Sequence, residues 1–157
     1  MTSSEALSYQ TLRIIDANLN RIGEGLRLLE DLARLLLNDA TLTQQLKTMR
    51  HEMLRGAWAF QQQLLQARDS QADVGISIEA PGEEKQRELP IMVVANARRV
   101  QESLRVMEEL AKIPDTKLDP EKFKQARFGL YTIERNLLSR LLRRDKTRRI
   151  AGLYVII

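Results

Sequence analysis

The sequence contains no cysteine and a single histidine among its 157 residues. The absence of cysteine excludes disulfides, thiolate nucleophiles and zinc or iron–sulfur sites with cysteine ligands. One histidine likewise excludes a metal centre built from several imidazoles. No apolar run approaches the roughly 18–20 residues of a membrane span, and the first residues lack the basic and apolar segments of a signal peptide. We therefore expect a soluble, cytoplasmic protein without a membrane partner.

The net charge of +4 is not spread over the chain. Residues 140–149 carry six basic side chains and one aspartate, a local charge of +5, so the remaining residues sum to about −1. A protein that binds nucleic-acid phosphates is expected to carry a broad basic face. The concentrated charge instead indicates a solvated helix tail or linker, and we expect no nucleic-acid partner.

Apolar residues recur at steps of three and four along most of the chain, which predicts amphipathic helices. Asp39 and Asp119 follow breaks in this pattern and are typical helix N-caps, the second being followed by a proline at the first helical position. Proline at residue 90 similarly favours a helix start. The predicted helices cover about residues 5–37, 42–67, 90–112 and 120–144.

Two segments depart from helical periodicity. Residues 69–89 contain Gly75, Pro81 and Gly82 and predict a long loop, which in a compact domain is usually functional or disordered. Residues 151–157, AGLYVII, form a β-rich apolar run that predicts a strand. We therefore expect a helical domain over residues 1–145, followed at 146–157 by a linker and the first strand of a further domain.

Residues 17–34 and 95–112 form an internal repeat with nine identical residues in 18 positions. The copies fall on the first and third predicted helices, so the sequence predicts an all-α bundle of about four long helices built from two related hairpins. A duplicated core needs only apolar residues, yet five matches are polar or charged: Asn18/Asn96, Arg21/Arg99, Glu24/Glu102, Arg27/Arg105 and Glu30/Glu108.

The position of these matches on the helix suggests a ligand cleft. At about 100° per residue, Asn18 falls within the apolar stripe and Arg21 lies on its edge, one turn before the small residue Gly25. The same pattern in the second copy would line a notch with hydrogen-bond donors. In the alternative interpretation, the two asparagines bond each other to fix helix register, and the charged matches form solvated ion pairs.

Other residues suggest phosphate chemistry. Arg68, Asp69 and Asp73 precede Gly75, and two aspartates beside an arginine are suited to holding Mg²⁺ against phosphate oxygens. No P-loop, GxGxxG motif or nucleophile motif is present. His51, next to Arg50, is a candidate general acid or phosphate ligand, or else a structural side chain. Arg127, Tyr131 and Glu134 share one helix face and form either a third wall of the cleft or a packed rim.

Four segments in order carry a family resemblance: RIIDANLNRIGEGLRLLEDLARLLLND, LKTMRHEM, ARDSQADVG and ANARRVQESLRVMEELAK. Together, over about residues 10–140, they resemble the helical hydroxymethylpyrimidine phosphate kinase domain found N-terminal to bacterial thiamine phosphate synthase. The terminal GLYVII is similar to the first barrel strand of that synthase. The resemblance does not extend to the active site of the synthase.

The resemblance implies ATP-dependent phosphorylation of 4-amino-5-hydroxymethyl-2-methylpyrimidine phosphate to the diphosphate, with Mg²⁺ and a covalently linked synthase domain in the parent protein. Under this hypothesis Arg21, Arg27, Arg99 and Arg105 neutralise phosphates, Asp69 and Asp73 hold the metal, and Asn18 and Asn96 bind the aminopyrimidine. Further substrate contacts are expected from Glu24, Glu102, Arg50, His51, Arg68, Arg127 and Tyr131.

Two other functions stay open. One is a non-catalytic module that oligomerises the synthase or senses the pyrimidine phosphate, and half-exposed apolar stripes are compatible with a homodimer. The other is a helical mutase of the chorismate type, in which arginines bind a dicarboxylate without metal or ATP and Asp69 and Asp73 have no role.

Overall fold

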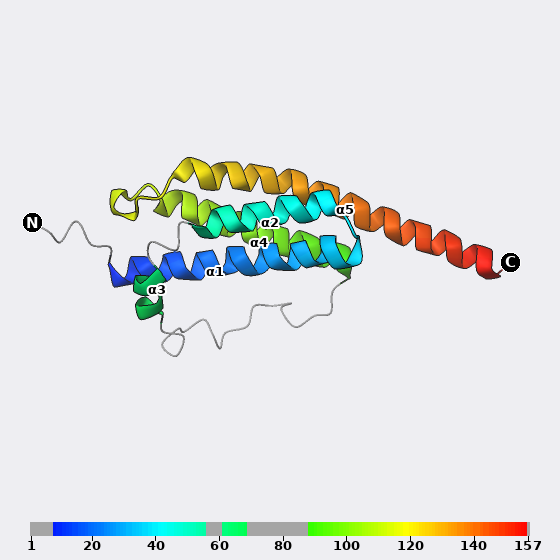
Figure 1. Ribbon diagram of the computed structural model, residues 1–157, viewed down its shortest axis with the longest axis horizontal. Helices are drawn as coiled ribbons and strands as arrows, with labels where there is room; N and C mark the ends of the chain where they lie inside the picture. Colours follow the sequence, from blue (N-terminus) through cyan, green and yellow to red (C-terminus); the bar gives the residue numbers. More distant parts are fainter. Residues whose placement is uncertain (1–7, 56–60, 69–87, 157) are drawn as a thin grey trace, which may run out of the picture.

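The computed structural model describes residues 8–55, 61–68 and 88–156. These residues form helices and no strand, which confirms the all-α prediction (Figure 1). The elements are α1 (Tyr9–Asp31), the π-helix η2 (Leu32–Leu36), α2 (Ala40–Arg55), α3 (Gln61–Ala67), α4 (Leu89–Leu110), the 3₁₀-helix η5 (Pro114–Thr116) and α5 (Pro120–Ile156).

Four long helices pack in a ring. Helix α1 contacts α2 and α4, and α5 contacts the other sides of α4 and α2. Neighbouring helices run in opposite directions, so α1–α2 and α4–α5 are antiparallel hairpins, and the short α3 lies against the start of α1 (Figure 1). The predicted bundle of two hairpins is confirmed. The pairs α1–α4 and α2–α5 form opposite sides of this ring.

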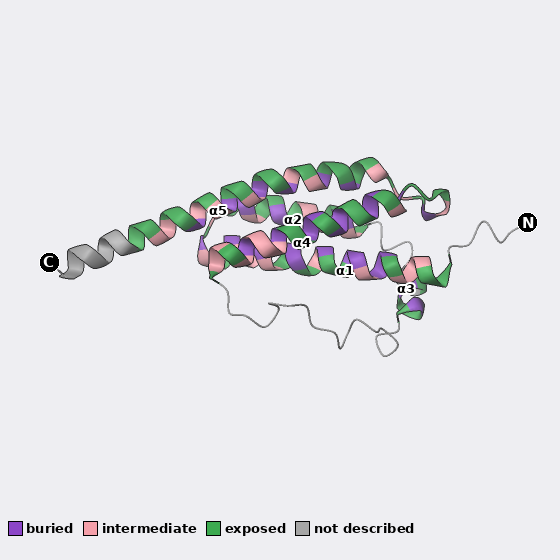
Figure 2. Cartoon of the chain, turned by 180° about the vertical axis from the view of Figure 1, so that it is seen from behind, coloured by how far each residue is buried: buried purple, intermediate pink, exposed green. Residues whose placement is uncertain are grey.

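The core lies where the apolar stripes of the four helices meet. Buried residues lie along the inner faces of the helices, and exposed residues cover the outer faces (Figure 2). Burying each large aliphatic side chain stabilises the fold by about 1.5–3 kcal/mol. The largest fully buried side chains are Ile15, Ile22, Leu26, Leu29, Leu46, Val93, Val100, Leu104, Met107, Leu130, Leu137 and Leu141.

The helix starts follow the predicted caps. The carboxylate Oδ1 of Asp39 accepts a hydrogen bond from the backbone N–H of Leu42 at 2.9 Å, and Oδ1 of Asp119 accepts from Glu121 N–H at 3.0 Å. Asn38 adopts the left-handed conformation, with φ of 50°, which reverses the chain before α2. The other oxygen of Asp39 accepts from Arg140 Nε at 3.1 Å and so joins this turn to α5.

The terminal strand prediction is wrong for residues 151–156, which continue α5 as helix. An isolated strand leaves its backbone N–H and C=O groups without partners, whereas continuation of a helix satisfies them within the segment. The helix passes through residue 145 without a break, and the domain boundary proposed there stays a prediction. The far end of α5 extends beyond the bundle (Figure 1).

Within the second predicted helix, the structure describes α2 up to Arg55 and α3 from Gln61 onward, and residues 56–60 lie outside the described residues. The predicted loop at 69–89 falls almost entirely outside the described residues. Within the part of the chain that the structure describes, no helix has both the length and the apolarity needed to cross a membrane.

Candidate functional site

The two copies of the repeat meet where α1 crosses α4. A Cβ atom added to Gly25 would overlap the Val100 side chain and lie 3.5 Å from the Asn96 carbonyl oxygen. Glycine is therefore required for this close approach of the helices. We call the outer edge of this contact the α1–α4 seam; its residues are Asn18, Arg21, Gly25, Asn96, Arg99 and Ser103.

Arg21 and Arg99 flank this seam. Arg21 precedes Gly25 by one helical turn, and Arg99 lies between Asn96 and Ser103 on the matching side of α4. Because Gly25 contacts Asn96 and Val100, Arg99 is about level with Gly25 and therefore about 6 Å along the helix axis from Arg21. Both arginines are exposed, and neither forms an ion pair with another described residue. The repeat thus places two exposed arginines along one edge of the helix contact, each followed by a glutamate three residues later.

The two asparagines share one hydrogen-bonding pattern. Asn18 Nδ2 donates to the Ile14 carbonyl and Asn96 Nδ2 to the Met92 carbonyl, each at 2.8 Å and one turn back. They do not bond each other, so the mutual bond of the alternative interpretation is not formed. Asn18 is only 3% exposed, and its Oδ1 accepts no hydrogen bond from the described residues. An unpaired buried acceptor costs about 1–3 kcal/mol, which a suitable donor would recover.

The glutamate pair of the repeat has a structural role. Glu30 Oε1 on α1 accepts from Arg50 Nε on α2 at 3.2 Å, and Glu108 Oε2 on α4 accepts from Arg127 Nε on α5 at 2.8 Å. Each hairpin is thus closed by the same largely buried ion pair. The hydrogen bond with Glu108 raises the pKa of Arg127. Arg50 and Arg127, predicted as substrate ligands, therefore lie in these hairpin contacts.

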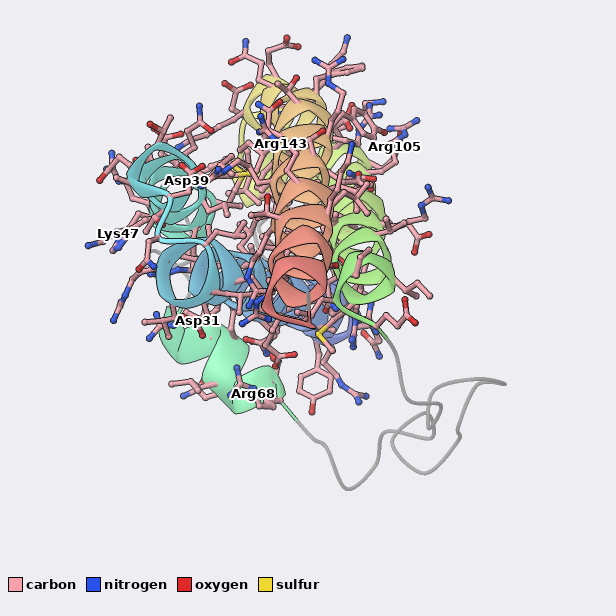
Figure 3. The ribbon with its side chains drawn as sticks, turned by 90° about the vertical axis from the view of Figure 1, so that its right-hand side faces the viewer. Asp31, Asp39, Lys47, Arg68, Arg105 and Arg143 are labelled. Carbon is pink, nitrogen blue, oxygen red and sulfur yellow. The ribbon has the colours of Figure 1, made fainter. Side chains whose placement is uncertain are left out.

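The remaining charged matches lie away from the seam. Helical geometry places Glu24 and Glu102 on the outer faces, and both are exposed. Arg27 lies on the α2 flank of α1, with no ion pair to another described residue. Arg105 lies on the α5 flank of α4, where it contacts Glu109 (Figure 3). The structure therefore brings together two of the four predicted catalytic arginines.

Arg68 is held by a residue that sequence analysis missed. Its Nη2 and Nε donate to the two carboxylate oxygens of Asp16 at 2.8 and 3.0 Å, which fixes the end of α3 to α1. This hydrogen bond and the charge of Asp16 raise the pKa of Arg68. Asp16 is 7% exposed and lies directly before the first copy of the repeat, where the second copy is preceded by Val94. The only sequence signal for Asp16 was therefore a charged residue beside the apolar stripe of the first copy.

The predicted metal ligands Asp69 and Asp73 lie outside the described residues. Among the residues that the structure does describe, no group of three or more histidine, aspartate or glutamate side chains is placed to hold a metal ion.

The predicted residues of α5 form a packed rim. Arg127 Nη1 donates to the Tyr131 hydroxyl at 3.4 Å, and the Arg127 guanidinium lies 4.8 Å from the Phe128 ring centre. Glu134 accepts from Gln101 Nε2 at 2.7 Å. The Gln101–Glu134 bond joins α4 to α5, whereas the two Arg127 contacts lie within α5. His51, on α2, is exposed.

The fold and the seam define an internally duplicated, all-α domain with two exposed arginines along the contact between the duplicated helices. The model of the ThiD2 family matches residues 13–136, and the chain belongs to this family. No solved structure matches the chain.

Its curated relatives include the thiamine-phosphate synthase of Rhodopirellula baltica, 42% identical over 117 residues that make up 74% of this chain and 31% of the relative. The thiamine-phosphate synthases of Nostoc punctiforme and Thermosynechococcus vestitus are 36% and 37% identical; the alignments cover 87% and 92% of this chain and 38% and 40% of those proteins. The chain therefore spans about a third to two fifths of the length of these relatives.

Proposed function

We propose that this chain is the kinase domain of a thiamine-biosynthetic protein that also carries a thiamine-phosphate synthase. It transfers the γ-phosphoryl group of ATP to the phosphate of 4-amino-5-hydroxymethyl-2-methylpyrimidine phosphate. A phosphate oxygen of the pyrimidine attacks the γ-phosphorus, the bond to the β-phosphate oxygen breaks, and ADP leaves. Support comes from the ThiD2 family membership and from relatives that are named thiamine-phosphate synthase but extend well beyond this domain.

The observation that carries the proposal is the pair of unpaired arginines, Arg21 and Arg99, at one seam. The acceptor is a phosphate that is largely ionised near neutral pH, so the reaction requires no strong general base. It requires positioning of two phosphate groups and neutralisation of their charge. Guanidinium groups are suited to this because they bind phosphate oxygens in a bidentate manner. In this proposal Arg27 and Arg105, on the other flanks, contribute less.

Asn18 gives the seam a way to recognise the pyrimidine. Its Oδ1 is an acceptor without a donor among the described residues, and the exocyclic amine of the substrate is a donor. Asn96, less buried and fixed by the same backbone bond, lies on the other side of the Gly25 contact. We assign the aminopyrimidine to Asn18 and the phosphates to Arg21 and Arg99, because the antiparallel crossing at Gly25 places Asn96 about 13 Å from Asn18 along the helix axis, too far to contact the same ring.

Asp69 and Asp73 would hold Mg²⁺, since carboxylate oxygens suit this cation. When bound, the ion would supply charge neutralisation for phosphoryl transfer. Asp69 directly follows Arg68, whose guanidinium is anchored to α1 through Asp16. The Asp16–Arg68 pair thus fixes the last described residue before these aspartates.

The direct experiment is to incubate the chain with ATP, Mg²⁺ and the pyrimidine monophosphate and to quantify products by mass spectrometry. We expect pyrimidine diphosphate and ADP in equal amounts, with neither formed when the pyrimidine or Mg²⁺ is omitted. Binding of the monophosphate without ADP formation would contradict the kinase proposal and support the non-catalytic module. Binding of dicarboxylates alone would support the mutase alternative.

A further inference from the structure

A groove lies between α2 and α5, on the side of the ring opposite the α1–α4 seam. Its volume is about 390 Å³, within the range of about 300–1,000 Å³ of small-molecule pockets. It contains none of the residues assigned to phosphoryl transfer above. The side chains that line it are Gln44, Gln45, Thr48, Met49, Glu52, Met53, Lys122, Gln125 and Ala126.

One wall of the groove presents an ordered donor and acceptor side by side. Gln44 Nε2 donates to Thr48 Oγ1 at 3.0 Å along α2. This bond leaves the Gln44 amide oxygen as an acceptor and the Thr48 hydroxyl hydrogen as a donor, one helical turn apart. An adjacent acceptor and donor match the amide-like edge of a nucleobase, as the paired groups of a glutamine side chain do with adenine. Gln45 and Gln125 add two further amides.

The floor of the groove is apolar and adaptable. Met53 is 3% exposed and Met49 is half-buried. The Met49 methyl group lies beside Gly129 on α5, at 3.5 Å from the position a Cβ would take, which is an ordinary packing distance. Methionine side chains fill irregular space and make favourable contacts with aromatic rings. A flat heterocycle would therefore lie on thioether groups while its edge faces the amides.

The groove carries one charge of each sign. Glu52 and Lys122 both line it, and neither forms an ion pair with another described residue. This balance offers no preference for a polyanion, in contrast to the two arginines of the seam. A carboxylate and an ammonium group are suited instead to bonding neutral hydroxyl groups, one as acceptor and the other as donor.

We propose that the α2–α5 groove binds an uncharged nucleoside-type ligand, that is, a heteroaromatic base with an adjacent donor and acceptor and a hydroxylated substituent. Because the bundle separates this groove from the seam, a ligand bound here does not take part in phosphoryl transfer. The groove is a second site, independent of the proposed kinase function.

The test is calorimetric titration of the full chain with adenosine, and with purine riboside, which lacks the exocyclic amine. We expect saturable binding of one adenosine per chain, and weaker binding of purine riboside by about 3–10-fold, the effect of one hydrogen bond. Thr48→Val and Gln125→Leu should each weaken adenosine binding by a similar factor. Gln66→Leu, at an exposed position of α3, is the matched control and should leave the affinity for adenosine unchanged.

Arg21→Ala/Arg99→Ala should retain adenosine binding, which separates this site from the seam. Absence of saturable binding at millimolar adenosine would overturn the proposal. It would also be overturned if the Thr48→Val and Gln125→Leu variants bound adenosine with the same affinity as the parent chain. Loss of binding in the Gln66→Leu control would also overturn it. Thermal unfolding of each variant verifies that it is folded before titration.

Discussion

The two hairpins agree in their interior contacts and differ at the helix crossing. Glu30–Arg50 closes the first hairpin and Glu108–Arg127 closes the second, at equivalent positions of the repeat. At the crossing, Gly25 of the first copy corresponds to Ser103 of the second, and α4 lies too close to Gly25 for a Cβ to fit without overlapping Val100. The residues shared by both copies of the repeat therefore fall into two groups: those that stabilise a hairpin and those that do not.

Arg21 and Arg99 belong to the second group. They are exposed and make no ion pair among the described residues, so neither hairpin depends on them. Their presence in both copies is explained if the seam holds an anion. Substitution of the seam arginines should therefore impair activity, and substitution of the hairpin glutamates should impair stability.

Replacing both seam arginines should have the largest effect. We expect Arg21→Ala/Arg99→Ala to lower kcat/KM for the pyrimidine phosphate by at least about 10³-fold, since one group that stabilises developing charge contributes about 10²–10³-fold. Unfolding free energy should change by less than about 0.5 kcal/mol, as for most surface substitutions. Arg98→Ala, an exposed neighbour on α4, serves as the control and should keep full activity. Comparable turnover in the double variant and in this control would show that Arg21 and Arg99 are not retained for phosphoryl transfer.

Among the charged residues retained in both copies, the two hairpin glutamates should contribute most to the free energy of unfolding. Glu30→Ala and Glu108→Ala each leave a largely buried guanidinium without its carboxylate, which costs about 3–5 kcal/mol for a fully buried pair and about 3 kcal/mol at these partly exposed sites. Urea denaturation should give similar losses for the two variants. The exposed Glu24→Ala and Glu102→Ala are the matched controls, with changes below about 0.5 kcal/mol. If Glu30→Ala and Glu108→Ala changed the free energy of unfolding as little as these controls, the repeated ion pair would not be what closes the hairpins.

The crossing should be sensitive to a single methyl group. Gly25→Ala gains about 1 kcal/mol of helix propensity, but the added methyl overlaps the fully buried Val100, and such overpacking costs about 1–3 kcal/mol. We expect a net destabilisation of about 1 kcal/mol. In a Val100→Ala background the overlap is removed and the same substitution should become stabilising. Thermal unfolding of the four proteins measures this coupling, and strictly additive effects would argue against close contact at Gly25.

The smallest effect is expected from an exposed group on α4. Hydrogen bonds from Lys112 and Arg105 lower the pKa of Glu109 below its ordinary value. Its contribution to stability is therefore complete above the unfolded pKa, about 4.3, and is lost as the pH falls through the lower folded value. Glu109→Gln should slightly flatten the decline of Tm between about pH 5 and pH 3. A steeper decline in the variant than in the parent chain would reverse the inferred sign.

Local patterns in the sequence predicted much of the fold, because its helices are set by near neighbours. The caps at Asp39 and Asp119 depend on hydrogen bonds two or three residues away, and both formed as expected. The composition of residues 151–156 predicted a strand, but helix continuation needs no partner strand, and α5 extends through them.

Contacts between distant segments were not predictable in the same way. Asp16 and Arg68 are 52 residues apart, and their pairing depends on how α3 packs against α1. The repeat marked Glu30 and Glu108 as retained, but their arginine partners became evident only from the packing of each hairpin. For the seam, sequence periodicity placed Arg21 beside the stripe, while its relation to Arg99 required the antiparallel crossing at Gly25.

If Arg21 and Arg99 bind the same anionic group, both side chains should respond to a single ligand. The measurement is NMR of the arginine side-chain Nε–H signals while the pyrimidine monophosphate is added without ATP. We predict that the Arg21 and Arg99 signals shift together with one common midpoint, while the Arg98 signal stays in place. Movement of only one of the two, or two different midpoints, would contradict a shared site.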